Sequence, residues 1–403
     1  MKSEWKTSPL RDLVGFISKG IAPSYADEES ETTVRVLNQK CNRNFRITYS
    51  ESRLHDLSRK KVPTERFVRI DDILINSTGA GTAGRIAQIC NLPCDTIVDG
   101  HMIIIRANNK VSQKYLGYAM KAHQWEVLQL DEGSTGQTEL NRERLLDEIM
   151  ISYPTSFALQ EMIVKTLEGI DRKLLINEKV NDNLQQQAAA LFESWFVNYD
   201  PWDGVQPSEW ENAPLGSFVE IKRGGSPRPI QDFLSDSGLR WLKISDVTSL
   251  SSPFVLEIKE HIKEEGLRKT VFLHAGELVL SNSATPGIPK ILDVDTCIHD
   301  GWLYFPKSEL SKYYLYLFFK HIRKELVALG NGSVFTNLKT DILKAFPATK
   351  ADESTLKEFD ALVTPLFDAM LNADRENFKL AAMRDALLPK LMSSEIDVSE
   401  VEL

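Results

Sequence analysis

Hydrophobic residues recur at coiled-coil spacing in two long stretches of the chain, residues 159–196 and 356–391. In each stretch the apolar positions step alternately by four and three residues, which keeps one face of a helix against a partner helix. Each stretch follows a segment of similar length that has a globular pattern. The spacing therefore predicts two long amphipathic helices that pair with each other.

Asparagines interrupt the apolar face of both stretches. Asn177 and Asn181 lie in the first and Asn377 in the second. A polar residue in such a seam costs stability but disfavours slipped pairings, so Asn177 and Asn181 are interpreted as register devices. The alternative is a local bend where the seam faces water. On the register interpretation, leucine at both positions should raise thermal stability while loosening the register.

Three residues predict irregularities in the second helix. Thr355 and Glu358 have capping-box spacing, which predicts a helix start near Thr355. Pro365 removes a helix hydrogen bond and clashes with the preceding turn, so a kink is expected there. Pro389 is expected to end the helix slightly early.

The two globular segments repeat each other in order. Trp5 recurs 205 residues later as Trp210, and the offset falls slowly to 198 along the segment. An ordered series of this kind indicates a duplicated domain. Other matched pairs are Gly20 with Gly224, Asp99-Gly100 with Asp300-Gly301, and Tyr115-Leu116 with Tyr314-Leu315.

Each repeat contains short strand-like runs bounded by Gly, Pro, Asn and Ser, together with a helix near residues 114–128 and 310–328. This mixture predicts an α+β fold. The predicted division is a first globular domain at 1–155, a helix at 156–201, a second globular domain at 202–350, and a helix with an acidic tail at 351–403.

Composition narrows the setting of the protein. At 403 residues the chain is too long for one ordinary domain. No apolar run reaches the ~18 residues of a membrane span and no signal sequence is evident, so a cytoplasmic protein without a membrane partner is expected. The net charge of −9 arises from the helices and tail. Acidic helices suit protein partners, while the near-neutral domains can still present basic loops to phosphates.

One glycine motif suggests a nucleotide site but fits it poorly. Residues 79–84 have G-x-G-x-x-G spacing. The following residues 85–89 read as a strand, and the second repeat holds Pro286 and Pro289 where a phosphate-binding helix should begin. These residues predict a glycine-rich hairpin.

Other candidate chemistry is equally weak. Asp200-Pro201-Trp202 is similar to an adenine-methyltransferase loop but lacks its second proline, and it is interpreted as a helix terminator. Cys90, Cys94 and His101 could suggest a metal, but no second ligand pair follows, so buried free thiols are expected. The sequence predicts neither a metal site nor a catalytic centre.

Polar and basic loops carry the remaining chemistry. Their Arg, Lys, Asn, Gln, Ser and Thr side chains are those that contact phosphates and base edges. Any one of them could equally populate a solvated turn, but the duplicated pattern favours DNA contact. The candidate DNA-binding residues are Lys60, Lys61, Ser77, Thr78, Arg85, Gln137, Asn141 and Arg142 in the first repeat, and Lys222, Arg223, Arg228, Asn282, Thr285, Lys290, Asn337 and Lys339 in the second.

Four stretches resemble recurrent phrases of the DNA-specificity subunit of Type I restriction-modification systems. They are residues 191–196 (LFESWF), 224–229 (GGSPRP), 241–246 (WLKISD) and 383–392 (MRDALLPKLM). The resemblance covers nearly the whole chain and is most specific in the helices, although Pro365 departs from the family's uninterrupted helix. It implies two target-recognition domains held apart by an antiparallel two-helix coiled coil, each reading half of a bipartite DNA site.

The resemblance also implies partners for a non-catalytic subunit. These are double-stranded DNA, two modification subunits that methylate adenine, and two restriction subunits. The complex is expected to use S-adenosylmethionine, ATP and Mg, none of them bound by this chain. Phe192 and Phe196 are expected on outer helix faces that favour assembly. Alternatives are the recognition component of another methyltransferase system and a coiled-coil scaffold that does not bind DNA.

Overall fold

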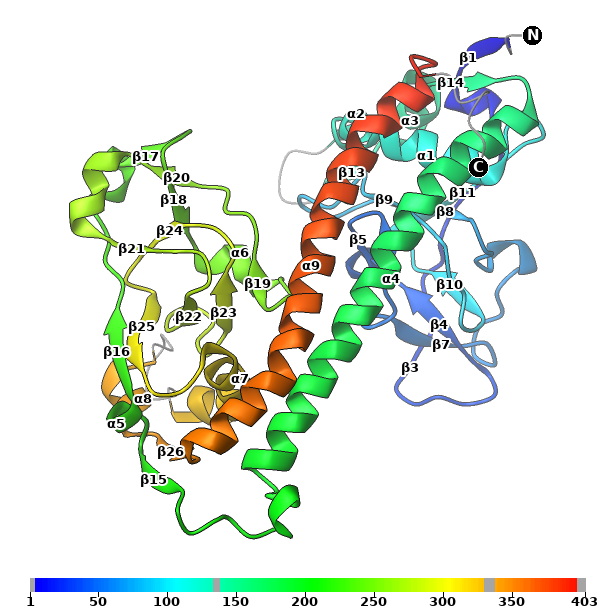
Figure 1. Cartoon of the computed structure of the whole chain (residues 1–403). Helices are drawn as coiled ribbons and strands as arrows, with labels where there is room; N and C mark the ends of the chain where they lie inside the picture. Colours follow the sequence, from blue (N-terminus) through cyan, green and yellow to red (C-terminus); the bar gives the residue numbers. More distant parts are fainter. Residues whose placement is uncertain (1–3, 133–137, 330–337, 397–403) are drawn as a thin grey trace. The chain divides into compact units, whose positions relative to one another are not determined.

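The computed structural model describes residues 4–132, 138–329 and 338–396 and contains two compact units (Figure 1). Unit 1 comprises Met1–Arg172 and Ala381–Leu403, and unit 2 comprises Lys173–Leu380. Each unit therefore holds one repeat together with part of each long helix. The four predicted segments do not coincide with these units, because both helices are divided between them.

Unit 1 is built on two four-stranded sheets. The first has the order β2-β11-β8-β9 and the second the order β10-β4-β7-β3. The strands are β1 (Trp5–Pro9), β2 (Val14–Lys19), β3 (Tyr25–Ala26), β4 (Thr33–Leu37), β5 (Asn42–Arg43), β6 (Arg46–Ile47), β7 (Arg53–Asp56), β8 (Ile73–Asn76), β9 (Ile86–Gln88), β10 (Thr96–Val98), β11 (Met102–Ala107), β12 (Asp131–Glu132), β13 (Glu139–Leu140) and β14 (Met150–Pro154). The short helices are α1 (Gln113–Ala122), α2 (Gln124–Leu128) and α3 (Arg142–Glu148).

Unit 2 repeats this plan with two five-stranded sheets, ordered β16-β25-β22-β23-β19 and β17-β20-β18-β24-β21. The strands are β15 (Glu211–Pro214), β16 (Val219–Arg223), β17 (Leu234–Ser235), β18 (Leu239–Leu242), β19 (Phe254–Val255), β20 (His261–Ile262), β21 (Val271–Leu273), β22 (Leu278–Ser281), β23 (Pro289–Leu292), β24 (Thr296–Ile298), β25 (Trp302–Ser308) and β26 (Pro347–Lys350). The helices are α5 (Leu215–Phe218), α6 (Ile244–Thr248), α7 (Lys312–Leu329) and α8 (Thr340–Ala345). The α+β class and the duplication are confirmed.

Equivalent hydrogen bonds fix the register of the duplication. The amide of Gly20 donates to Met102 O at 2.9 Å, and that of Gly224 donates to Trp302 O at 2.9 Å. Met102 and Trp302 therefore correspond, which matches Asp99 with His299. The repeat in the sequence pairs Asp99 with Asp300, which is one residue out of register. The reason is that both copies contain an Asp-Gly pair, although these pairs occupy different positions in the backbone.

Gly20 and Gly224 are required by this close approach of two chain segments. A Cβ on Gly20 would lie 2.0 Å from Asp99 O, and one on Gly224 would lie 2.3 Å from His299 O. No side chain fits at either place, so both repeats keep glycine where this loop crosses the sheet.

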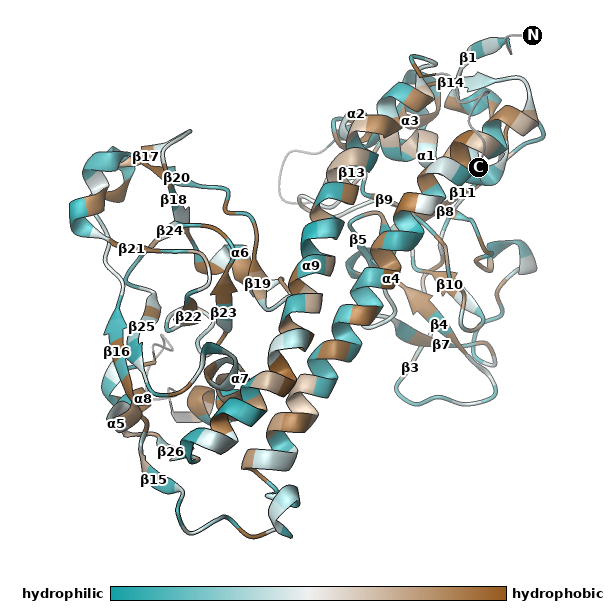
Figure 2. Ribbon diagram, in the orientation of Figure 1, coloured by the Kyte–Doolittle hydropathy of each residue, from teal (hydrophilic) through white to brown (hydrophobic). Residues whose placement is uncertain are grey.

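The two long helices are α4 (Phe157–Phe196) and α9 (Glu353–Met392), with 40 residues each. They lie alongside each other (Figure 1), and both carry hydrophobic and hydrophilic residues along their whole length (Figure 2). The pairing is antiparallel, because Asn177 contacts Asn377 whereas Asn181, further along α4, contacts Met370. The paired long helices are confirmed.

The ends of α9 differ from those expected. Asp352 caps the helix, since its Oδ1 accepts hydrogen bonds from the amides of Ser354 and Thr355 at 3.0 and 3.1 Å. Thr355 is therefore inside the helix, which also continues through Pro365 and past Pro389 to Met392. The missing proline hydrogen bond does not break α9, because its buried face packs into the core of unit 2 with Phe359, Val363 and Phe367.

The two seam asparagines of α4 are buried and do not face water. Asn177 and Asn181 are each 5% exposed. Asn177 Nδ2 donates to Glu376 and Asn377 at 2.7 and 2.9 Å, and Asn181 Nδ2 donates to Asp374 at 2.7 Å. The spacing of apolar residues in the seam does not reveal these polar partners. Because leucine would remove the hydrogen bonds, it is expected to lower stability and not to raise it.

Asn181→Leu is expected to lower the stability of unit 2 by about 1–3 kcal/mol, because the half-buried Asp374 loses a donor. The matched control is Asn183→Leu, which changes an exposed residue on the same helix. Thermal unfolding followed by circular dichroism measures the difference. A melting temperature for Asn181→Leu at or above that of the wild type would support the original expectation.

Two other expectations about burial are wrong. Phe192 and Phe196 are only 3% and 7% exposed and belong to the core of unit 2, where α7 covers them. Cys90 and Cys94 are exposed free thiols, whereas Cys41 and Cys297 are buried. Sequence pattern could not decide these cases, because each depends on which distant segment covers the residue.

The described residues form neither a membrane-spanning helix nor a cluster of metal ligands. Among them, no helix is long and apolar enough to cross a membrane. The same residues contain no group of three or more His, Cys, Asp or Glu side chains placed to hold a metal ion.

Candidate nucleic-acid interface

Three loops of unit 2 meet at one end of the β16-β25-β22-β23-β19 sheet. They are residues 224–230 after β16, residues 282–288 between β22 and β23, and residues 299–301 before β25. The amide of Asn282 donates to Gly301 O at 2.8 Å, and that of Gly225 donates to Ile298 O at 3.2 Å. The loops are thus held together by backbone contacts that do not depend on their side chains.

Unit 1 has the same arrangement. The amide of Ser77 donates to His101 O at 2.8 Å, and that of Ile21 donates to Val98 O at 3.1 Å. Residues 77–85 form the hairpin between β8 and β9, with β9 starting at Ile86. The glycine-rich hairpin predicted there is confirmed, since a strand follows the glycines.

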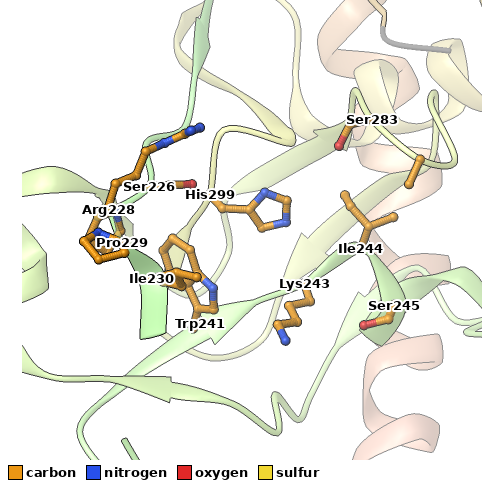
Figure 3. A pocket seen from close by; sticks show the side chains of 12 residues that line it. Ser226, Arg228, Pro229, Ile230, Trp241, Lys243, Ile244, Ser245, Ser283 and His299 are labelled. Atoms are coloured by element: carbon orange, nitrogen blue, oxygen red, sulfur yellow. The ribbon is translucent and has the colours of Figure 1, made fainter. Parts of the chain in front are cut away.

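A cavity of about 760 Å³ opens among the loops of unit 2 (Figure 3). The rings of Trp241 and His299 lie 5.8 Å apart and form an aromatic wall. Hydroxyl groups and two cations stand around it. The lining residues are Ser226, Pro227, Arg228, Pro229, Ile230, Trp241, Lys243, Ile244, Ser245, Ser283, Ala284 and His299. An aromatic wall with polar edges suits a flat heterocyclic group such as a base.

Asp300 orients Arg228 beside this cavity, whereas Lys243 pairs with Glu260. Ser226 Oγ donates to Asp300 Oδ1 at 2.6 Å, and the guanidinium of Arg228 donates to Oδ2 at 3.1 Å. The hydrogen bond from Ser226, with Arg223 and Arg228 nearby, lowers the pKa of Asp300 below its usual value. Asp300 therefore stays ionised at neutral pH. The Arg228 side chain remains 78% exposed and can exchange this carboxylate for a phosphate or a base edge.

Several residues predicted in unit 2 are accessible, and two of them, Arg223 and Arg228, belong to the loop cluster. Lys222, Arg223, Arg228 and Lys339 are exposed and Thr285 is half-buried. Arg223 donates to the backbone oxygen of Asp300, so it joins the same loop cluster as Arg228. Lys222 instead pairs with Glu220 at 2.8 Å. Asn337 lies outside the described residues.

The predicted residues of unit 1 form a looser set. Lys60, Lys61 and Arg142 are exposed. Lys60 Nζ donates to Ala22 O at 2.7 Å, which brings the basic run against the loop after β2. In the hairpin, Thr78 Oγ1 lies 2.7 Å from His101 Nδ1, and Arg85 donates to Gly81 O at 3.0 Å. Gln137 lies outside the described residues.

Four predicted contact residues have structural positions instead. Ser77, Asn282 and Lys290 are only 1%, 2% and 3% exposed, so they cannot contact DNA at the surface directly. Asn141 caps α3, accepting from the amides of Glu143 and Arg144 and donating to Glu132. Sequence reasoning could not separate these from exposed loop residues of the same composition.

Lys290 is the most consequential of these corrections. Its ammonium group donates to Leu250 O at 2.7 Å and to Ser252 O. Ser252 Oγ in turn donates to Asp374 on α9, which also accepts from Asn181 on α4. Lys290 thus starts a polar chain that connects β23 to both long helices within unit 2.

Burial lowers the pKa of Lys290 to about 7, helped by the charge of Lys320. The unfolded lysine titrates near 10.4, so between about pH 7 and 10 the unfolded state binds the extra proton. The contribution of Lys290 to the free energy of unfolding therefore rises with pH between about pH 7 and 10. Below about pH 7 both states are protonated and the cost of burying the ammonium is complete.

Lys290→Met is expected to abolish this pH dependence. Relative to the variant, the wild type should gain about 2 kcal/mol of unfolding free energy between pH 6.5 and 9. Denaturant unfolding followed by tryptophan fluorescence measures it, with the exposed Lys357→Met as control. Burial raises the pKa of Asp374 and the charge of Lys290 lowers it, so the comparison begins at pH 6.5, above the usual range of a carboxyl group. A wild-type-to-variant difference that stays constant with pH would contradict a buried, titrating Lys290.

Sequence reasoning missed the cavity residues Trp241, Lys243, Ser245 and His299. Trp241 and His299 have no basic or amide signature, and they come from segments nearly 60 residues apart in the chain. The only available signal was the stretch 241–246, which carried the family resemblance but was not assigned to a site.

Comparison with known proteins supports the duplicated plan. The family model "Type I restriction modification DNA specificity domain" matches residues 2–186 and 207–349. The chain is 24% identical to the Type I restriction enzyme MjaIX specificity subunit of Methanocaldococcus jannaschii, covering 99% of this chain and 95% of that protein. It is 23% identical to the Type I restriction enzyme HindI specificity subunit of Haemophilus influenzae, covering 59% of this chain and 67% of that protein.

A solved structure shows the same fold. The crystal structure of the Type-I restriction-modification system S subunit from M. genitalium matches with a TM-score of 0.59 at 15% identity, over 97% of this chain and 96% of that one. The family model covers both repeats and well over half of the residues. The chain therefore belongs to the family of Type I restriction modification DNA specificity domains.

Proposed function

We propose that this chain is the DNA-specificity subunit of a Type I restriction-modification enzyme and reads a bipartite site with its two repeats. The observation that carries the proposal is the duplicated loop cluster, held in each repeat by equivalent backbone hydrogen bonds. A chain with two such clusters in separate compact units can contact two separate DNA segments. The specificity subunits named among its relatives support this assignment.

The division of chemistry within the cluster suits DNA. Exposed cations such as Arg223 and Arg228 can bind phosphates or guanine edges, and the aromatic and hydroxyl groups of the cavity can distinguish bases. Phosphate contacts set the position of the domain and base contacts set its sequence preference. The chain itself then supplies recognition and no catalytic group.

Catalysis would reside in partners. We assign to them two methyltransferase subunits using S-adenosylmethionine and two endonuclease subunits using ATP and Mg. The long helices offer a docking surface in place of the buried Phe192 and Phe196. On α4, Leu175, Ile176 and Val180 are 42%, 45% and 45% exposed, an apolar patch on an otherwise acidic helix.

Mapping of N6-methyladenine tests the proposal. Cells expressing the methyltransferase partner with this chain should methylate one bipartite sequence, and cells lacking this chain should not. The purified complex should bind a duplex carrying that sequence more tightly than a scrambled duplex. Equal binding of both duplexes, or methylation unchanged by removal of this chain, would support a scaffold without DNA recognition.

A further inference from the structure

Helix α7 carries cations for which the structure provides no acidic partner. Among the described residues, Lys320 and Arg323 make neither a hydrogen bond nor an ion pair, and Arg323 Nε is buried without a partner. Burial and the charge of Arg323 lower the pKa of Lys320. Both cations also oppose the charge on Lys290. Placing unneutralised cations so close together costs free energy that an anion would recover.

The first repeat shows what this position does when it is not cationic. Gln124 corresponds to Arg323, by the same offset of 199 that relates Tyr115 to Tyr314. Gln124 Nε2 donates to Gly84 O at 2.7 Å, and Gln124 Oε1 accepts from the amide of Ile86 at 2.8 Å. The glutamine therefore fastens the glycine hairpin of unit 1 to its helix.

The second repeat cannot use this fastening. Pro289 replaces Ile86 in the strand register, since Ile86 pairs with Ile75 and Pro289 pairs with Leu280. Proline has no amide hydrogen to donate. Arg323 still touches the hairpin, because a Cβ on Gly287 would lie 3.2 Å from Arg323 Cγ. The guanidinium thus lies beside the hairpin without taking part in its hydrogen bonds.

We propose that Arg323, reinforced by the charge of Lys320 one turn before it on α7, binds a phosphate of the DNA backbone beside the 282–288 hairpin of the second repeat. The planar guanidinium offers paired donors that match a phosphate, and the lysine adds a second charge. The same hairpin contributes Ser283 and Ala284 to the cavity wall. A backbone phosphate held at Arg323 would therefore position the duplex next to the groups that read bases. This inference rests on the proposed function and adds a positioning contact to it.

Salt-dependent DNA binding by the complex with its methyltransferase partner tests the site. Arg323→Gln should weaken binding roughly tenfold at 0.1 M salt, for the mapped target and for an unrelated duplex alike. The slope of log affinity against log salt should become shallower by about 1, and the methylated sequence should not change. Arg323→Lys should retain most of the affinity, and Lys320→Gln should show a smaller loss of the same kind.

The control is Lys357→Gln, which removes an exposed cation of unit 2 on α9 and should leave affinity and slope unchanged. Circular dichroism establishes that each variant is folded; if Arg323→Gln is not, Arg323→Lys and Lys320→Gln decide the question. Unchanged affinity and slope would overturn the inference, as would a loss confined to the target sequence. Wild-type complex that binds no DNA would instead refute the proposed function.

Inorganic phosphate separates a DNA phosphate from a free one. Calorimetric titration of the DNA-free complex with phosphate should show at most weak binding. Phosphate binding that Arg323→Gln abolishes, together with unaltered DNA affinity in that variant, would assign the site to a free anion and overturn the DNA assignment.

Discussion

Exchange of residues 211–350 for the equivalent domain of a related specificity subunit changes one half of the methylated DNA sequence and leaves the other half as it was. The expectation follows from the repeat, because the loop cluster of unit 2 is built wholly from residues within that range. The strand pair β15–β26 closes the exchanged segment at its two ends. Genome-wide mapping of N6-methyladenine before and after the exchange measures the result.

Three packed tryptophans at the end of α4 and in the segment after it decide where the exchange should begin. Trp202 packs against Trp195 at 5.7 Å and against Trp210 at 4.7 Å between ring centroids. An exchange beginning at residue 202 would replace two of these rings and leave the third. A matched exchange of 202–350 should therefore give the same new half-site with a less stable protein. If both halves of the sequence changed in the 211–350 exchange, the repeats would form one continuous reading surface.

Asp72→Ala is expected to destabilise unit 1 by about 3–5 kcal/mol, because it leaves a buried guanidinium without its carboxylate. Arg106 donates to both oxygens of Asp72 at 2.7 Å, and the two side chains are 12% and 2% exposed. Arg106 also donates to the backbone oxygens of Glu65 and Phe67. Denaturant unfolding of the variant measures the loss.

Two controls separate burial from charge. The double variant Asp72→Leu/Arg106→Met should recover much of the stability, since no charge is then buried alone. Arg11→Ala removes an ion pair to Asp147 whose side chains are 46% and 57% exposed, and it should cost at most about 1 kcal/mol. Arg106 binds the backbone of Glu65 and Phe67, which follow the basic residues Lys60 and Lys61 in the chain. The milder change Asp72→Asn should therefore weaken DNA binding only at the half-site that the first repeat reads. Equal losses for Asp72→Ala and Arg11→Ala would refute the buried pair.

The family and the fold plan could be predicted from local pattern and internal repetition. Seam spacing gives the two long helices because burial on one helix face imposes a period on the sequence itself. The duplication can be recognised in the sequence because Gly20 and Gly224 lie at close backbone contacts that leave no room for a side chain, so both repeats have glycine there. The hairpin at residues 79–84 could be predicted because the sequence after its glycines has the pattern of a strand, which the structure contains as β9.

The site could be predicted only in part. The exposed cations Arg223 and Arg228 lie in the loop cluster, as their composition suggested. Lys290 is also a lysine in a polar stretch of sequence, but it lies under residues 250–252. There its ammonium group donates hydrogen bonds to backbone carbonyls. A lysine in a polar loop and a lysine beneath one look alike until the covering segment is known.

The sequence by itself therefore determined the repeat, the paired helices and the family, since each is encoded by spacing along the chain. Tertiary structure decided which loop residues are accessible and which ones line the cavity with Trp241 and His299. It also decided why Arg323 has no partner among the described residues where Gln124 has two. Those properties depend on contacts between segments far apart in the chain. Such contacts follow from how sheets and helices close on each other, and no local period records them.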